Sequence, residues 1–143
     1  MKLYTIGFNK KTSEEFFAQL NQPGLNRVVD VRLRNTSAFA GFTKMADLRF
    51  FLRQINDIDY VHQISLAPSK PILTQFQRTR DFPLYIQHIL RLITERNIEK
   101  RVSKSLIDGA CLLGSEAMAE KCHRWFVAEY LREKWGDLEI IHL

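Results

Sequence analysis

The chain has 143 residues, of which 45% are hydrophobic and 26% charged, and its net charge is +5. This size suits one domain with its own apolar core, so we expect a single domain over residues 1–143 and not two. No apolar run reaches the roughly 18 residues that a membrane-spanning helix needs, and the first residues turn polar too early for a signal peptide.

The expected elements alternate between strands and helices along the chain. Apolar or β-branched runs predict strands at residues 3–6, 27–32, 59–63, 111–113 and 138–141. Apolar residues that recur every three or four positions predict helices at 14–20, 47–55, 82–96 and 119–135. Residues 66–71 contain two prolines and are expected to form a loop over the strand ends. The alternation predicts an α/β fold: a single three-layer domain with a mostly parallel sheet of about five strands and helices on both faces.

The cysteines and the charge bear on compartment and partner. Two cysteines, Cys111 and Cys122, are too few for the disulfide framework of a small secreted domain. We therefore expect a cytoplasmic protein that does not enter a membrane. The excess of basic residues favours an anionic partner, which could be a small molecule or a nucleic acid.

Polar side chains gather where the second and third predicted strands end. Asp30 and Arg32 fall at alternate positions, so they should share one side of the strand end. Arg32 offers a planar fork for a carboxylate or phosphate, and an internal salt bridge with Asp30 is the alternative. His62 ends the third strand, where its imidazole could move a proton or bind a ligand, or could simply pack. In open α/β sheets, ligands bind beyond the carboxyl ends of the strands.

The fourth predicted strand leads to Ser115 and Glu116, and Cys122, His123 and Arg124 follow in the opening turn of a helix. The helix terminus, Arg124 and a protonated His123 would lower the pKa of the Cys122 thiol and make it a nucleophile. Consecutive helical residues project about 100° apart, so the three side chains are not expected to converge. Cys122 packed in the core, with His123 as a cap, is the alternative. Glu116 could act as a general base, pair with Arg124, or complement the helix dipole.

Metal ligation and two common nucleotide motifs do not fit the sequence. Adjacent Cys122 and His123 diverge on a helix, and neither Cys-x-x-Cys nor His-x-x-x-His occurs, so no metal is expected. The segment after Gly7 lacks the glycines of a dinucleotide fingerprint or of a P-loop. The identity of a cofactor therefore stays open.

A set of short motifs spread along the chain points to a known family. The motifs are Thr5-Ile6-Gly7, Asp30-Val31-Arg32 with Ser37, Ala40-Gly41-Phe42-Thr43-Lys44 followed by Asp47-Leu48, Tyr60 to His62 with Leu66-Ala67-Pro68, and Cys111-Leu112-Leu113 through Glu116 to Cys122-His123-Arg124. With them the chain resembles, over nearly its full length, the bacterial and archaeal proteins grouped as domain of unknown function, family 488. One position departs, because such proteins usually carry a cysteine where this chain has Gly114. If that cysteine serves a metal or a redox pair, this chain has lost it.

The resemblance implies a single α/β domain with a shared polar site, and no particular reaction. The shared residues correspond here to Gly7, Asp30, Arg32, His62, Glu116, Cys122, His123 and Arg124. We expect Glu116, Cys122 and His123 to carry any chemistry. The residues expected to bind the ligand are Gly7, Asp30, Arg32, His62, Ser115 and Arg124. The expected ligand is phosphorylated or nucleotide-like, and the sequence leaves open whether the protein is an enzyme.

Two other functions fit the sequence. A nucleic-acid-binding module without catalysis is suggested by aromatic residues interleaved with cations, because exposed aromatics beside cations can stack bases. These residues are Phe39, Phe42, Phe50 and Phe51 with Arg34, Lys44, Arg49 and Arg53. The same phenylalanines at helical spacing also suit a core. A homo-oligomer or adaptor subunit is the other possibility, and exposed phenylalanines would favour it.

Overall fold

The computed structural model describes the backbone of residues 1–143 and every side chain except those of Ala38 and Phe39, and over this range five strands form one sheet. The strands are β1 (Lys2–Gly7), β2 (Arg27–Asp30), β3 (Asp59–His62), β4 (Ala110–Gly114) and β5 (Glu139–His142). Their order across the sheet is β3-β2-β4-β1-β5, and every neighbouring pair is parallel. The expected parallel α/β sheet is confirmed.

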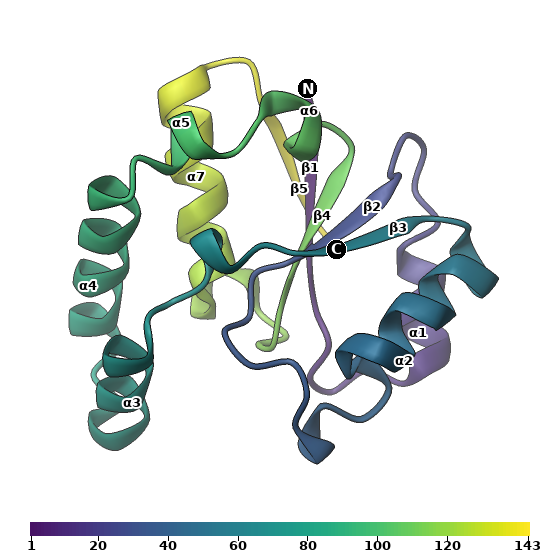
Figure 1. Ribbon diagram of the computed structural model, residues 1–143, viewed down its shortest axis with the longest axis horizontal. Coiled ribbons are helices and arrows are strands. Elements are labelled where there is room, and N and C mark those ends of the chain that lie inside the picture. Colours follow the sequence, from purple (N-terminus) through teal and green to yellow (C-terminus); the bar gives the residue numbers. More distant parts are fainter.

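Helices cover both faces of the sheet, as Figure 1 shows. One face carries α1 (Ser13–Gln19) and α2 (Met45–Phe51), which continues as the π-helical segment η2 (Leu52–Asn56). The other face carries α4 (Phe82–Glu95) and α7 (His123–Trp135), with α3 (Lys70–Thr79) packed on α4. Short helices complete the chain: α5 (Ile98–Arg101), α6 (Lys104–Ile107) and the 3₁₀ segments η1 (Ala38–Thr43), η3 (Ile64–Leu66) and η4 (Ala119–Lys121). None of the helices in the described residues has the length and apolar character needed to cross a membrane.

The sheet separates two apolar cores, because successive side chains of a strand point to opposite faces. Leu3 of β1 joins the core beneath α4 and α7, whereas Tyr4 joins the core beneath α1 and α2. Phe16 and Leu48 fill the second core, and both are fully buried. The structure is therefore the expected arrangement of three layers.

The loop predicted at residues 66–71 is wrong at its end, because α3 begins at Lys70. Pro71 lies in the first turn of this helix, where a missing backbone N–H costs nothing. Ser69 caps the helix, since its hydroxyl accepts a hydrogen bond from the backbone N–H of Ile72. No side chain of α3, whose residues are all described, is fully buried, so this helix lies on the rim of the domain.

The register of the sheet brings the predicted site residues to one edge. Gly7 at the end of β1 pairs with Gly114 at the end of β4, and Asp30 at the end of β2 pairs with Leu113. The segments that follow these three strands therefore leave the sheet side by side. Residues 31–34 and 115–124 belong to those segments, and the candidate site is built from them.

Candidate functional site

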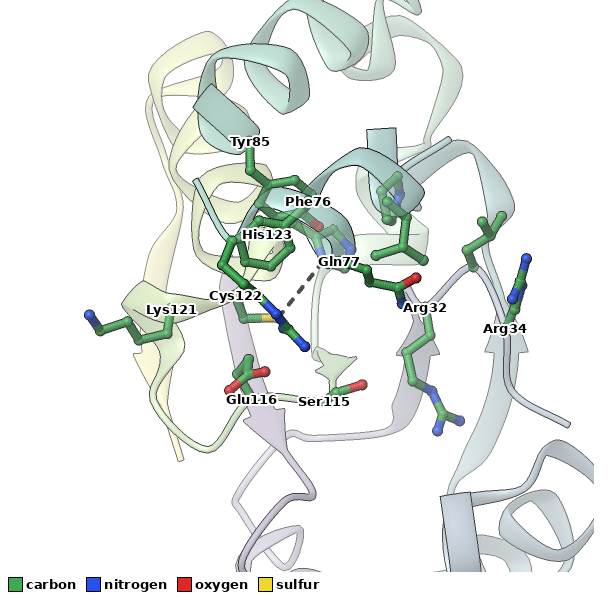
Figure 2. Close-up of a pocket in the computed structure, with 14 residues that line it drawn as sticks. Arg32, Arg34, Phe76, Gln77, Tyr85, Ser115, Glu116, Lys121, Cys122 and His123 are labelled. Atoms are coloured by element: carbon green, nitrogen blue, oxygen red, sulfur yellow. Dashed lines mark hydrogen bonds between the residues drawn. The ribbon is translucent and has the colours of Figure 1, made fainter. Parts of the chain in front are cut away.

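A pocket of about 290 Å³ opens at the carboxyl edge of the sheet, as Figure 2 shows. The segments after β2 and β4, the start of α7, α3 and one residue of α4 form its walls. Five of the predicted site residues line it: Arg32, Ser115, Glu116, Cys122 and His123. The same pocket is also lined by residues that were not predicted from the sequence, among them Phe76, Gln77, Arg80, Tyr85 and Lys121.

Cys122 and His123 converge, contrary to the expectation that they diverge. Cys122 is the residue before α7 and has an extended backbone (φ −126°, ψ 145°), so the 100° spacing of helical residues does not apply to it. Its Sγ atom lies 3.8 Å from Nδ1 of His123. Both side chains are nearly buried, with exposed fractions of 5% and 6%, and both line the pocket. The thiol is therefore paired with the imidazole and also lines the pocket.

A main-chain contact determines which nitrogen of His123 faces the thiol. Nε2 lies 2.7 Å from the carbonyl oxygen of Val31 and donates to it, because a carbonyl can only accept. In the neutral ring Nδ1 is then the unprotonated nitrogen, which can take the proton of the Cys122 thiol. The contact with Val31 thus leaves Nδ1 of His123 as the nitrogen that faces the Cys122 sulfur.

Electrostatics favour the thiolate form of Cys122. Burial alone raises the pKa of this thiol, but the hydrogen bond and charge of His123 and the charge of Arg124 outweigh burial and lower the pKa to about 6. Cys111 is the opposite case, because complete burial raises the pKa of its thiol despite nearby Arg124 and Lys11. Cys122 should therefore be ionised at neutral pH and Cys111 should not.

Arg124 follows Cys122 and His123 in the chain but is not among the described residues that line the pocket. Its side chain is fully buried, and Nη1 donates to the carbonyl oxygen of Glu116 at 2.6 Å. Pairing of Arg124 with the Glu116 carboxylate was one of the alternatives for Glu116, and Arg124 contacts the main chain of residue 116 instead. The Glu116 side chain itself is exposed at the pocket rim. Arg124 acts on the site through its charge and by holding the chain at residue 116.

Two glycines allow this close packing. A Cβ atom on Gly7 would collide with the carbonyl oxygen of Glu116, so only glycine lets the segment after β4 cross the end of β1. A Cβ atom on Gly114 would come within 2.5 Å of Sγ of Cys122. Gly114, the position of the departure from the family pattern, therefore lies directly against the thiol.

Asp30 and Arg32 form the internal salt bridge that was the alternative to ligand binding. Nε and Nη2 of Arg32 donate to the two carboxylate oxygens of Asp30, each at 2.8 Å, and further bonds from Nη1 and Nη2 reach Thr43. Burial raises the pKa of Asp30, but the hydrogen bonds and charge of Arg32 lower it overall. The hydroxyl of Tyr60 also donates to Asp30, at 2.6 Å. The Arg32 guanidinium is thus committed to the protein, although it borders the pocket.

His62 supports the main chain beside this salt bridge. Its Nε2 atom lies 2.7 Å from the carbonyl oxygen of Arg32, to which it donates. His62 and His123 therefore hold consecutive carbonyl groups after β2, those of Arg32 and Val31. His62 is not among the described residues that line the pocket.

The exposed cations of the pocket were not among the site residues predicted from the sequence, and Arg80 also comes from a segment that was not expected there. Arg34, Arg80 and Lys121 line the pocket with exposed side chains. Arg80 directly follows α3 in a left-handed conformation (φ 56°), and its guanidinium lies over the ring of Phe76. This conformation ends α3, and the backbone N–H of Arg80 donates to the carbonyl oxygen of Phe76. The sequence did contain a signal for α3, because a serine followed by a proline two residues later is typical of a helix start. Recognising this helix would also have indicated Arg80, the residue that ends it.

The aromatic and basic residues near α2 are divided between the edge of the core and the surface. Phe42 and Phe51 pack against the core beneath α1 and α2, whereas Phe50 is 60% exposed. Arg53 forms ion pairs with Asp57 and Asp59. The side chain of Phe39, which the nucleic-acid hypothesis included, lies outside the described residues. Among the side chains that the structure describes, no group of three metal-ligand residues gathers at one place.

The fold and the site define a class of protein: a parallel five-stranded α/β domain with a cysteine-histidine pair in a basic pocket at its strand ends. A family model described as "Domain of unknown function DUF488" matches residues 12–131, and the chain belongs to this family. The resemblance inferred from the motifs is thereby confirmed. Neither the comparison with curated proteins nor that with solved structures gave a match.

Proposed function

We propose that this protein binds a small anionic ligand in the pocket and that Cys122 acts on this ligand as a nucleophile. The observation that supports the proposal most is the placement of the Cys122 sulfur, 3.8 Å from Nδ1 of His123 and facing a pocket bordered by exposed cations. A nucleophilic thiol needs a base within reach, a lowered pKa and access to substrate. Cys122 has all of these, and Cys111 is fully buried in β4.

His123 supplies the proton transfer in this proposal. Its Nδ1 atom takes the proton of the thiol, while Nε2 stays bound to the carbonyl group of Val31. The result is a thiolate beside an imidazolium, which can later return the proton to the reacting ligand. Glu116, exposed at the rim, is a second acid or base in reach of the pocket.

Arg34, Arg80 and Lys121 bind the anionic part of the ligand in this proposal. Their side chains are exposed and border the pocket, whereas the guanidinium of Arg32 is already bonded to Asp30 and Thr43. A phosphorylated or nucleotide-like compound carries the charge that such cations bind. The pocket volume of about 290 Å³ limits the ligand to a small molecule.

Four of the predicted ligand-binding residues have a structural role in this proposal and do not contact the ligand: Gly7, Asp30, His62 and Arg124. They hold the segments after β1, β2 and β4 against one another through the contacts described above. Ser115, at the pocket wall, is placed to contact the ligand. Because both cysteines are free thiols and one is reactive, we also place the protein in a reducing cytoplasm.

Protection of Cys122 from alkylation tests the proposal. Iodoacetamide should modify Cys122 in the folded protein and leave Cys111 untouched, as peptide mass spectrometry can show. Inorganic phosphate or a nucleoside monophosphate should slow this modification in a saturable way. Cys122→Ser should remove the modification, and Cys111→Ser is the matched control that should keep it. Equal modification of both cysteines, or no protection by either anion, would refute the proposal.

A nucleic-acid-binding module is the second candidate, and the exposed ring of Phe50 on α2, a helix that also carries the exposed Arg49, is the observation that favours it. It has less support, because Phe42 and Phe51 pack on the core and Arg53 pairs with acidic residues. Mixed oligonucleotides should then bind with an affinity that falls steeply as the salt concentration rises. The absence of binding at low salt would remove this candidate.

A further inference from the structure

The chain contains four tyrosines, and three of their hydroxyls have a hydrogen-bond partner in the described part of the chain. Tyr4 donates to the carbonyl group of Pro23 at 2.7 Å, Tyr60 to Asp30 at 2.6 Å, and Tyr130 to Glu99 at 2.8 Å. The hydroxyl of Tyr85 has no such partner among the described residues, although only 6% of this side chain is exposed. A buried tyrosine hydroxyl usually finds a partner. Tyr85 therefore differs from the other three.

Tyr85 also differs in what its hydroxyl faces. The residue lines the pocket that holds Cys122 and His123, and its hydroxyl is not sealed in the interior. The ring stacks on Phe76 of α3, with centroids 4.2 Å apart and planes 17° from parallel. In the view of Figure 2, Tyr85 and Phe76 lie on the opposite side of Cys122 from Glu116. The stacking on Phe76 thus fixes the ring, and the hydroxyl group of Tyr85 remains available to a ligand in the pocket.

The surroundings keep this hydroxyl protonated. Burial raises the pKa of Tyr85, and the negative charges of Cys122 and Glu116 raise it further. At neutral pH the group is therefore a neutral hydrogen-bond donor and not a base. A neutral donor suits an oxygen that is uncharged in the free ligand and gains charge during the reaction. The charged oxygens of a phosphate or carboxylate are better partners for Arg34, Arg80 and Lys121.

From this arrangement we infer that Tyr85 donates a hydrogen bond to the carbonyl oxygen of the ligand that Cys122 attacks, so that the ligands are anionic aldehydes or ketones. The inference rests on the proposed function and names its substrate class. The Cys122 thiolate forms a bond to the carbonyl carbon, and the π electron pair of the carbonyl moves to its oxygen. Tyr85 stabilises the resulting oxyanion, and the His123 imidazolium returns the proton taken from the thiol. The product is a hemithioacetal, or a hemithioketal from a ketone, in which the former carbonyl oxygen is a neutral hydroxyl group, and the step needs neither a leaving group nor an oxidant.

Two probes that differ in a single group test the inference. 3-Carboxybenzaldehyde carries a carboxylate and an aldehyde, and benzoate carries the carboxylate alone. The dissociation constant of each is measured by protection of Cys122 from iodoacetamide, and the loss of aldehyde absorbance reports the adduct. The aldehyde should bind the wild-type protein more tightly than benzoate does. Tyr85→Phe should weaken aldehyde binding by up to about tenfold, since the hydrogen bond from Tyr85 to the oxygen of the adduct is lost.

The controls separate this inference from the function on which it rests. Tyr85→Phe should leave the binding of benzoate and of inorganic phosphate unchanged, and Tyr130→Phe should change none of these constants. If Tyr85→Phe weakens the binding of all three ligands equally, Tyr85 has only a packing role and the inference is wrong. The inference is also wrong if the aldehyde binds wild type and Tyr85→Phe equally, or binds no better than benzoate, while phosphate still protects Cys122. If Cys122 is unreactive or phosphate gives no protection, the proposed function fails and the inference fails with it.

Discussion

The carbonyl oxygen of Val31 accepts a hydrogen bond of 2.7 Å from Nε2 of His123, and this contact leaves Nδ1 of the ring facing the sulfur of Cys122. Val31 follows β2 directly, and its own N–H donates to the carbonyl group of Leu113 in β4. The orientation of the imidazole is therefore fixed by the pairing of the central strands. The sheet therefore orients the imidazole that faces the Cys122 thiol.

Replacing the imidazole should return the thiol to ordinary acidity. In His123→Ala the hydrogen bond and charge that lower the pKa of Cys122 are lost, while burial, which raises that pKa, remains. The midpoint of the pH profile of alkylation should rise from about 6 to that of an unactivated thiol, about 8.5 or higher. His88→Ala is the matched control, since His88 lies on α4 outside the pocket. A midpoint that stays near its wild-type value in His123→Ala would show that another group activates the thiol.

Adding one methyl group at Gly114 should disturb the thiol pair. The new Cβ atom would lie 2.5 Å from Sγ of Cys122, so the sulfur must move away and lose its alignment with His123. We expect Gly114→Ala to slow alkylation at pH 7 and to raise its pH midpoint. Gly24→Ala serves as the control, because a Cβ atom there meets open space and only the positive φ is unfavourable. Unchanged alkylation in Gly114→Ala would mean that the sulfur does not depend on this contact.

Removing the charge of Arg80 should weaken anion binding. Its guanidinium borders the pocket, whereas Arg78, two residues earlier, does not line the pocket and is exposed on α3. The concentration of inorganic phosphate that halves the alkylation rate of Cys122 should rise several-fold in Arg80→Gln, because one charge-assisted hydrogen bond is lost. Arg78→Gln should match wild type. Equal effects of the two variants would indicate only general attraction of anions to a basic surface.

Asp30 should control the stability of the fold and its acid sensitivity. In Asp30→Asn the buried guanidinium of Arg32 loses its counter-charge, and breaking such a pair costs about 3–5 kcal/mol of unfolding free energy. The pKa of Asp30 is lowered in the folded protein, so its stabilisation is fully present above its ordinary value of 3.8 and is lost as the pH falls through the folded value. Urea unfolding should therefore show a difference in the free energy of unfolding between wild type and Asp30→Asn at pH 7, and this difference should become smaller in acid. Asp57→Asn, at a surface ion pair, is the control and should change little.

The sequence was sufficient to predict the strands and the edge at which the site lies. Apolar runs ending in polar residues marked the ends of β2 and β4, and parallel pairing brings such ends together. The salt bridge of Asp30 with Arg32 also followed from their spacing, as one of two alternatives. The strand ends and the salt bridge depend on residues that are close in the sequence, so local patterns were enough to find them. The common edge follows from the general rule that the ends of parallel strands meet.

The pairing of Cys122 with His123 and the wall formed by α3 could not be predicted in this way. The former depends on where α7 begins, and a shift of one residue changes Cys122 from helical to extended backbone. The latter depends on tertiary packing, because Phe76 and Tyr85 reach the strand ends only after α3 folds back along α4. Arg80 and Tyr85 were missed for the same reason.

The pH profile of Cys122 alkylation in the wild-type protein tests the central claim most directly. Rates are measured with iodoacetamide from pH 4 to pH 10, and Cys111 in the same molecule is the internal reference. The structure predicts a midpoint near pH 6 for Cys122 and no reaction at Cys111 while the protein stays folded. A midpoint near that of a free thiol, about 8.5, would contradict the claim that His123 and Arg124 hold Cys122 as a thiolate.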